Sequence, residues 1–157
     1  MARASWAGSP VIQAIVIGIP TERVKARARL LWDVAPRTCQ AIVDCLPMAG
    51  RAHHAIYSGS EIALILPTFF EVEPENATTE VATGDLAFTY MRAGSHHGVN
   101  ADFSELCWFY DDDARPSMWE GPVPVSVFAR IEAGTEFYRV CREMRLTGAK
   151  EVEVRVG

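Results

Sequence analysis

The sequence lacks several features that would place a protein in a broad functional class. Its Lys and Arg residues are scattered, so no basic stripe is available to neutralise a run of phosphates, and the formal net charge is −5. The most apolar N-terminal stretch, residues 11–19, is shorter than the roughly 20 residues that a membrane helix needs, and no clear signal-peptide cleavage site follows it. We therefore expect a cytoplasmic protein that binds neither nucleic acid nor a membrane.

Motifs for the common covalent and cofactor chemistries are also missing. The four cysteines form no C-x-x-C pair, and the sequence has no phosphate-binding loop, nucleophile elbow or Cys–His arrangement. Cys39 and Cys141 fall on the apolar faces of two expected helices, where a free thiol packs as a small hydrophobe. We expect reduced, structural cysteines, as is usual in the cytosol, and no cofactor. The sequence points to no particular reaction.

The composition is that of an ordinary soluble domain. Hydrophobic residues make up 49% and charged residues 22% of the 157 positions, close to the average for globular proteins. A chain of this length buries one core of ordinary size, and we find no internal repeat or low-complexity tract. We expect a single domain over residues 1–157.

Period-2 alternation of apolar and polar residues predicts about eight β-strands. In one example, Ala26 and Ala28 alternate with Lys25, Arg27 and Arg29. The expected strands cover residues 11–19, 24–32, 51–57, 61–66, 85–91, 105–110, 123–131 and 151–156. Closing a mostly antiparallel set of this size into a barrel removes exposed sheet edges, so we expect a mainly β, closed eight-stranded barrel.

Two segments change to the helical period. Between Pro36 and Pro47 the apolar residues stand at i, i+3, i+4 and i+7, and the same spacing recurs in residues 135–144. Pro36 is tolerated in a first helical turn, whereas Pro47 ends the helix. We expect two short, one-faced helices that cover the sheet.

Four stretches of the sequence resemble a bacterial family of small cyclophilin-like proteins of unknown function. They read APRTCQAIVDCLP, GRAHHAIYSGSEIALILP, GDLAFTYM and EGPVPVSVFARI, and the similarity extends over about residues 24–131. The order of elements is also similar to that of the cyclophilin-like barrel. The resemblance implies this fold, but it implies no particular function.

Cyclophilin-type prolyl isomerases carry a Phe-x-Arg-x-x-Pro segment in the third strand and a Gln-x-x-x-Asp-like run in the fourth. Neither is present here, because Arg51 lacks the surrounding Phe and Pro. A weak or vestigial prolyl isomerase is therefore an alternative rather than the first hypothesis. An oligomeric interaction module, such as a homo-oligomer, is a second alternative.

One expected hairpin carries several titratable and aromatic groups. A three-residue turn at residues 58–60 would pair Tyr57 with Glu61 and His53 with Ile65, and it would place these side chains on the outer face. His54 and Ile56 would then point into the barrel. Two long connections, residues 92–104 and 111–122, are the loops best suited to complete a binding site.

These observations predict a ligand pocket outside the barrel. Its candidate residues come from the hairpin and from the two loops: His53, Tyr57, Glu61, His96, His97, Arg115 and Trp119. The expected ligand is a small polar metabolite, a carboxylate among the candidates, since Arg pairs with carboxylates in a fixed geometry. In the alternative interpretation, His54 is a hydrogen-bonded core residue, His53 is an ordinary surface residue and Trp119 closes the barrel end.

The two His-His pairs do not by themselves predict a metal site. Neighbouring strand residues point to opposite faces, so each pair offers at most one ligand to a given site, and no H-x-H or H-x-x-x-H spacing is present. A site of His54 with His96 or His97 would also need Glu61 or Glu105. We expect no bound metal.

Overall fold

The structure of residues 11–157, a computed structural model, is built around one antiparallel sheet that closes on itself. The wall runs β2-β1-β11-β3-β4-β7-β6-β10, and β10 pairs back to β2. The eight strands are β1 (Ala14–Ile19), β2 (Val24–Leu30), β3 (Met48–His54), β4 (Glu61–Ile65), β6 (Asp85–Met91), β7 (Phe103–Phe109), β10 (Val125–Ile131) and β11 (Lys150–Val156). The expected closed eight-stranded barrel with two helices is confirmed. Residues 1–10 of the expected single domain lie outside the described residues.

Alternation along the strands separates the barrel interior from its surface. In β2, Ala26, Ala28 and Leu30 are buried while the Lys and Arg between them are exposed. The interior is filled by large side chains of the other strands and of one helix, chiefly Trp108, Tyr110, Phe88, Phe128 and Phe137. The prediction that Trp108 and Tyr110 are core aromatics is confirmed. Burial of this apolar area is the main stabilising term of the fold.

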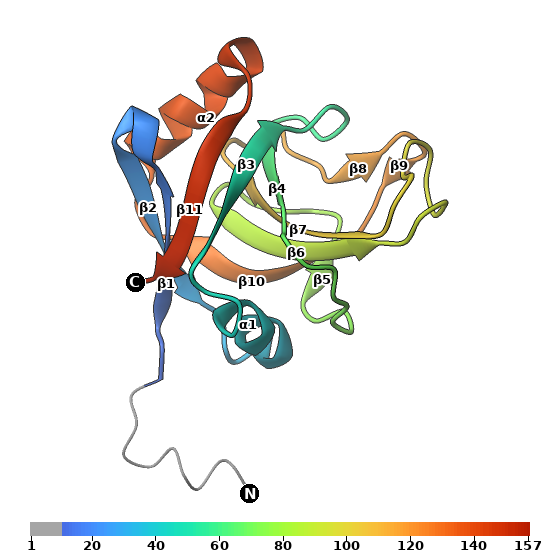
Figure 1. Cartoon of the computed structure of the whole chain (residues 1–157), viewed down its shortest axis with the longest axis horizontal. Coiled ribbons are helices and arrows are strands. Elements are labelled where there is room, and N and C mark those ends of the chain that lie inside the picture. The colour runs from blue at the N-terminus through green and yellow to red at the C-terminus, as the bar shows by residue number, and fades with distance from the viewer. Residues whose placement is uncertain (1–10) are drawn as a thin grey trace, which may run out of the picture.

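The two helices lie on opposite sides of the barrel in Figure 1, with α1 (Pro36–Val43) below and α2 (Thr135–Thr147) above. Cys39 and Ile42 of α1 and the apolar stripe of α2 join the main core. Cys39 and Cys141 are buried free thiols, as predicted. A short 3-10 turn, η2 (Pro20–Glu22), connects β1 to β2.

The acidic segment of residues 69–83 is anchored rather than free. The carboxylate of Glu75 accepts hydrogen bonds from the backbone N–H groups of Arg37 and Thr38, at 3.2 and 2.8 Å. It therefore caps the first turn of α1, whose own N-cap, Ala35, has no side chain able to do so. Within the same segment β5 (Ala77–Thr78) pairs with the start of β10.

Several predicted boundaries differ from the structure. The strand expected at residues 51–57 is β3, which begins at Met48 and ends at His54. The second helix continues to Thr147 instead of residue 144. The loop expected at residues 111–122 contains a two-stranded ribbon, β8 (Ser117–Met118) with β9 (Gly121–Pro122). These differences leave the order of the barrel elements unchanged.

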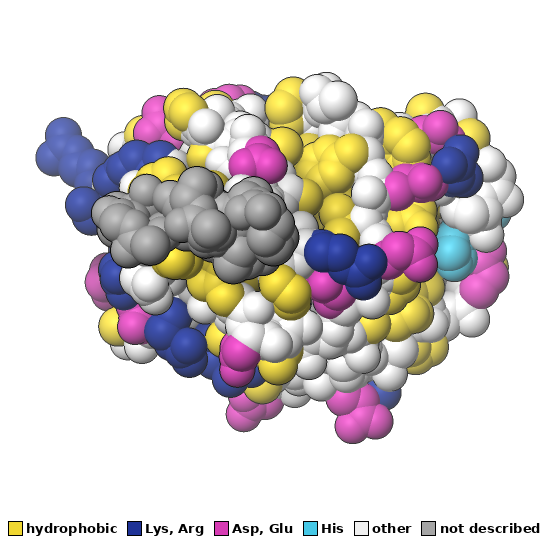
Figure 2. Space-filling view, turned by 90° about the horizontal axis from the view of Figure 1, so that it is seen from below, with side chains coloured by type: hydrophobic (Ala, Val, Ile, Leu, Met, Phe, Trp, Pro, Cys, Tyr) yellow, Lys and Arg dark blue, Asp and Glu magenta, His cyan; other side chains and the backbone are white. Residues whose placement is uncertain are grey.

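The surface carries mixed charge. On the face in Figure 2, Lys and Arg side chains stand in separate groups with acidic and hydrophobic side chains between them. Within residues 11–157, no helix has the length and apolar character that crossing a membrane requires.

Candidate functional site

The β3–β4 hairpin has a longer loop than the sequence predicted. His53 pairs with Ala63 and His54 with Ile62, and the backbone N–H of Ala55 donates to the carbonyl of Glu61 at 2.9 Å. The pairing is shifted by two residues, so the expected partners are wrong but the faces are unchanged, because side chains alternate with period 2. His53 and Glu61 lie on the outer face as predicted. Ile56 does not enter the barrel: it belongs to the loop and is 84% exposed.

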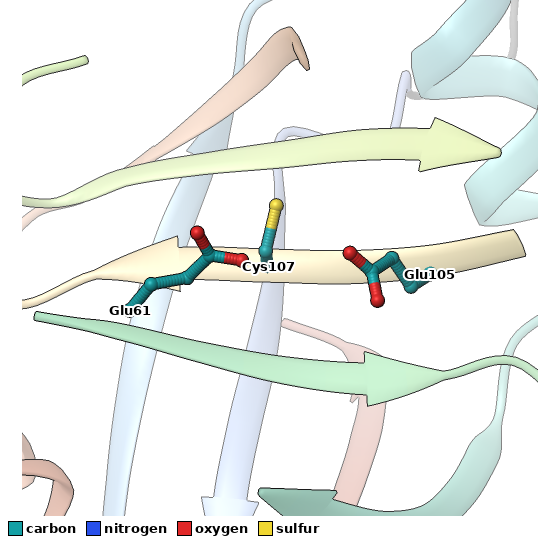
Figure 3. A group of neighbouring side chains, drawn as sticks. All are labelled: Glu61, Glu105 and Cys107. Carbon is teal, nitrogen blue, oxygen red and sulfur yellow. The ribbon is translucent and has the colours of Figure 1, made fainter. Parts of the chain in front are cut away.

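Two acidic side chains and a thiol meet on the outer face of β4 and β7. Cys107 pairs with Ala63 of β4, Glu105 precedes it by two residues on the same face, and Glu61 is the diagonal neighbour. Potential ligand atoms of Glu61, Glu105 and Cys107 all lie within 4.8 Å of one another. In Figure 3 the two carboxyl groups extend toward Cys107 from either side. We call these three residues the acidic floor.

Small neighbours leave space around the acidic floor. Cys107 has Ala63 opposite it on β4 and Ala87 opposite it on β6. Methyl groups at these two positions fill little of the volume above the sheet, so the long Glu side chains can fold over Cys107. A large residue at either position would occupy the same space.

Glu61 is a buried acid without full compensation. It is only 5% exposed, and its Oε1 is the one fully buried side-chain N or O atom of residues 11–157 that lacks a hydrogen-bond partner. None of the ion pairs found within residues 11–157 includes Glu61 or Glu105. Native proteins rarely leave a buried polar group unpaired, so this oxygen calls for a functional explanation.

Burial makes both acids hold their protons to unusually high pH. It raises the pKa of Glu61 to about 7, although hydrogen bonding with Ser58 and Cys107 acts in the opposite direction. The pKa of Glu105 rises to about 8 through burial and through the charge of Glu61. Burial also lowers the pKa of His53, which therefore favours the neutral imidazole. Shifts of this kind cluster at functional sites.

Aromatic side chains from three segments form the rim of the site. Tyr57 and Trp119 meet edge to face with ring centroids 6.0 Å apart, and His97 lies 5.8 Å from Trp119. The backbone N–H of His97 donates to Glu120 at 2.8 Å, which joins the two long loops. Trp119 is 66% exposed, so much of its indole remains open to solvent.

The loop that carries Tyr57 is held against the loop of residues 111–117. The carbonyl of Ser58 accepts from the backbone N–H of Arg115 at 2.8 Å, and the Ser58 hydroxyl accepts from that of Ser117 at 2.9 Å. Gly59 has φ +70°, and a Cβ there would stand 2.6 Å from the carbonyl oxygen of Asp113. The close contact of the two loops therefore requires glycine at this position.

Floor and rim enclose a cavity of about 370 Å³. Four predicted site residues line it: His53, Tyr57, Glu61 and His97. Trp119 stands at its edge through the contacts with Tyr57 and His97. His96 and Arg115 are not among the lining residues; His96 lies 3.2 Å from the Ser95 hydroxyl, and Arg115 is exposed. Ile65, Val99, Phe103 and Met118 supply apolar wall.

His54 belongs to a separate network at the end of the barrel. Its Nδ1 lies 2.8 Å from the carbonyl oxygen of Ala55 and its Nε2 2.7 Å from the Tyr110 hydroxyl, which also accepts from Arg145 at 3.0 Å. This is the hydrogen-bonded histidine of the alternative interpretation. His53, in contrast, lines the cavity.

Glu105 and Cys107 were absent from the predicted site. The available signal was the phase of β7: Leu106, Trp108 and Tyr110 form the core face, which places Glu105 and Cys107 on the outer one. Phase alone could not show which strand lies beside them, because β4 and β7 are far apart in the chain. Chemically, the floor offers two carboxyl groups and a thiol, a set that suits a hydrogen-bonding ligand or a metal ion.

The comparisons with known proteins define the fold and the family. None of the curated proteins shows a significant match. A solved structure of McbB in complex with tryptophan aligns with a TM-score of 0.65 and 16% identity, over 90% of this chain and 44% of McbB, so this chain spans less than half of that protein. The solution structure of the hypothetical protein AF2241 from Archaeoglobus fulgidus aligns with a TM-score of 0.57 and 22% identity, over 96% and 99% of the two chains.

At these identities both likenesses concern the fold alone. The family model described as "Protein of unknown function (DUF3830)" matches residues 17–156, nearly the whole described chain. The chain therefore belongs to this family of unknown function.

Proposed function

We propose that the cavity on the outer face of the barrel binds a small polar metabolite. The observation that carries this proposal is the unpartnered, 95% buried carboxyl of Glu61 in the wall of a cavity of about 370 Å³. Cavities that bind small molecules typically measure about 300–1,000 Å³ and combine apolar walls with a few polar groups. A ligand that donates to Glu61 Oε1 would satisfy an atom that the protein itself leaves unpaired.

The walls suit a ligand with an apolar or aromatic body. Phe103 and Ile65 line one part of the cavity, and Tyr57 stands near its opening with the exposed indole of Trp119. Aromatic side chains of this kind supply large contact area at a low loss of conformational freedom. The ligand would lie with its polar end at the acidic floor and its body against this aromatic rim.

A carboxylate ligand needs a particular arrangement in such a site. It would meet Glu61 and Glu105 rather than the Arg115 guanidinium, which lies outside the lining. Two routes avoid repulsion: the floor carboxyl groups can be protonated and donate, or a bound cation can stand between them and the ligand.

The wider context is part of the same proposal. The order of elements and the sequence resemblance support a cyclophilin-like barrel from a bacterial cytoplasmic protein. McbB, of similar fold over this region, was solved with tryptophan, a small molecule with an aromatic body and polar end groups, and this fits the proposed ligand class. The alternative of a prolyl isomerase gains no support from Arg51, whose exposed guanidinium lies 3.5 Å from Glu151 of β11 and outside the cavity lining.

A thermal-shift screen of metal-free protein against small amines, amino acids and organic acids tests the proposal. Ligands that bind the native state raise the melting temperature. For each compound that does so, we expect a smaller shift in Glu61→Gln, which changes the floor, and in Trp119→Ala, which removes the indole at the rim.

The matched control is His96→Ala, which removes a loop imidazole outside the lining and is expected to keep the full shift. Equal shifts in the wild type, Glu61→Gln and Trp119→Ala would place binding elsewhere and contradict the proposal. A screen of this breadth without any stabilising compound would also count against it.

A further inference from the structure

We propose that the acidic floor is a binding site for a divalent metal ion of the zinc type. Glu61, Glu105 and Cys107 would be its protein ligands, and one coordination position would remain open toward the cavity. The part of this inference that concerns an organic ligand rests on the proposed function, whereas the metal site itself does not.

The spacing of the ligand atoms comes close to that of a metal site. Zinc binds oxygen at about 2.0–2.2 Å and sulfur at about 2.3 Å in tetrahedral geometry, so its ligand atoms lie about 3.5 Å from one another. Here the atoms of all three residues already lie within 4.8 Å of one another. Side-chain rotations that move each group by about an ångström would close the shell, with no change in the strands.

The unpartnered oxygen of Glu61 is an independent sign of a missing partner. Its Oε1 is buried and has no hydrogen bond, although the hydroxyl of Ser58 lies close enough to act on the other side of the carboxyl group. No Lys or Arg forms an ion pair with either floor acid within residues 11–157. A cation is therefore the partner that would supply both charge and coordination.

The kinds of ligand favour zinc over magnesium or calcium. Magnesium and calcium take oxygen ligands almost exclusively, whereas zinc accepts thiolate and carboxylate together. Cys107 is wholly buried beside the two acids in Figure 3, so its sulfur is available only to an ion held at the floor. Three protein ligands and one open position are typical of catalytic rather than structural zinc sites.

The open position explains how an acidic cavity could receive a carboxylate. Glu61 and Glu105 line the cavity wall, so an ion between them would face the cavity. The ion would carry water in the free protein and exchange it for an oxygen of the ligand. The apolar body would still lie against Tyr57 and Phe103.

Titration of the untagged, metal-stripped full chain with Zn²⁺ or Co²⁺ alone tests the metal site. We expect one ion per chain by calorimetry and a rise in melting temperature with Zn²⁺. With Co²⁺ we expect a thiolate-to-cobalt charge-transfer band in the near ultraviolet and visible bands of tetrahedral intensity. Absence of the charge-transfer band at full Co²⁺ occupancy would exclude Cys107 as a ligand and overturn the proposed site.

Variants at the floor provide the second test. Glu61→Gln and Glu105→Gln should each weaken Zn²⁺ binding at least tenfold, since loss of even an outer partner of a metal ligand typically costs about 10–100-fold. Cys107→Ser should abolish the charge-transfer band, and Cys107→Ala serves in its place if the serine variant does not fold. Affinity that stays at the wild-type value in both Gln variants would contradict the proposal.

The controls address other sites where zinc could bind. Cys45→Ser removes the exposed thiol, His96→Ala a loop imidazole and Glu73→Gln an exposed carboxylate, and all three should bind Zn²⁺ as the wild type does. Loss of binding in one of them, with the floor variants unchanged, would place the ion at that residue and overturn the proposal.

The two proposals fail in different ways. Absence of metal binding, together with organic compounds that stabilise the metal-free protein in a Glu61-dependent manner, would refute the metal site and leave the ligand pocket standing. Metal binding that depends on the floor residues, without any organic ligand in the presence or absence of Zn²⁺, would support the metal site and refute the proposed function.

Discussion

Glu61 and Glu105 approach each other within 4.8 Å on the outer face of the barrel, one from β4 and the other from β7. Acids this close resist simultaneous ionisation unless a cation or hydrogen-bond donors compensate them. The strands impose this proximity, because β4 and β7 are paired over the length of β4. The stability of the metal-free protein should therefore depend on pH in a way that reports on these two side chains.

In metal-free protein, Glu61→Gln should remove part of the fall in stability at rising pH. The pKa of Glu61 is raised from 4.5 to about 7, so between these values the folded state holds a proton that the unfolded state has lost. The free energy of unfolding then falls as pH rises, by on the order of 3 kcal/mol from this group. Urea unfolding from about pH 5 to about pH 8 should show a shallower decline for Glu61→Gln.

Ile65→Val, a neutral change in the same cavity wall, is the control and should keep the wild-type pH dependence. A decline in Glu61→Gln as steep as that of the wild type would show that this carboxyl does not hold its proton in the folded state.

Gly59→Ala should destabilise the protein more than Gly94→Ala. Both glycines have positive φ, +70° and +81°, which disfavours alanine in each case. Only at Gly59 would the new Cβ stand 2.6 Å from a backbone oxygen, that of Asp113, whereas the space around Gly94 is open. We expect a loss of about 1 kcal/mol at Gly94 and about 3 kcal/mol at Gly59, measured by urea unfolding. Equal losses would mean that the two loops are not in close contact.

Glu75→Ala should lower the free energy of unfolding by about 2 kcal/mol, because it leaves the first turn of α1 uncapped. The buried hydroxyl of Thr38, which donates to Glu75 at 2.9 Å, would also lose its acceptor. Glu75→Gln retains an acceptor and should lose less. Glu73→Ala, an exposed acid in the same segment, should change stability by no more than about 0.5 kcal/mol. Thermal or urea unfolding of the three variants would reveal any other order.

Tyr110→Phe should cost about 1–2 kcal/mol of stability without a change in the shape of the core. Its hydroxyl bridges His54 and Arg145, and each would be left without this partner. Tyr90→Phe, which removes a hydroxyl from a partly buried side chain outside this network, should have the smaller effect. The measurement is again urea unfolding, and an equal effect of the two substitutions would contradict a structural role for the bridge.

Local sequence patterns were sufficient for the elements of the barrel and for the face on which each side chain lies. Ala26 and Ala28 are buried and their Arg neighbours exposed, as the alternation predicted. His53 and Glu61 lie on the outer face even though their predicted strand partners were wrong, because a shift of two residues preserves the alternation. Residue patterns also brought His97 and Trp119 into the predicted site, although they reached His96 and Arg115 equally and could not separate them from the others.

The acidic floor was decided by the tertiary structure. Its three residues come together because the chain, after leaving β4, returns through β6 before β7 pairs beside β4, and nothing local to Glu61 or Cys107 specifies that pairing. The length of the β3–β4 loop depended likewise on contacts with the loop of Asp113. Alternation is a property of neighbouring residues and can be read along the chain. The position of one strand beside another results from closing the whole barrel around a common core, and this is why the sequence by itself indicated a face but not a site.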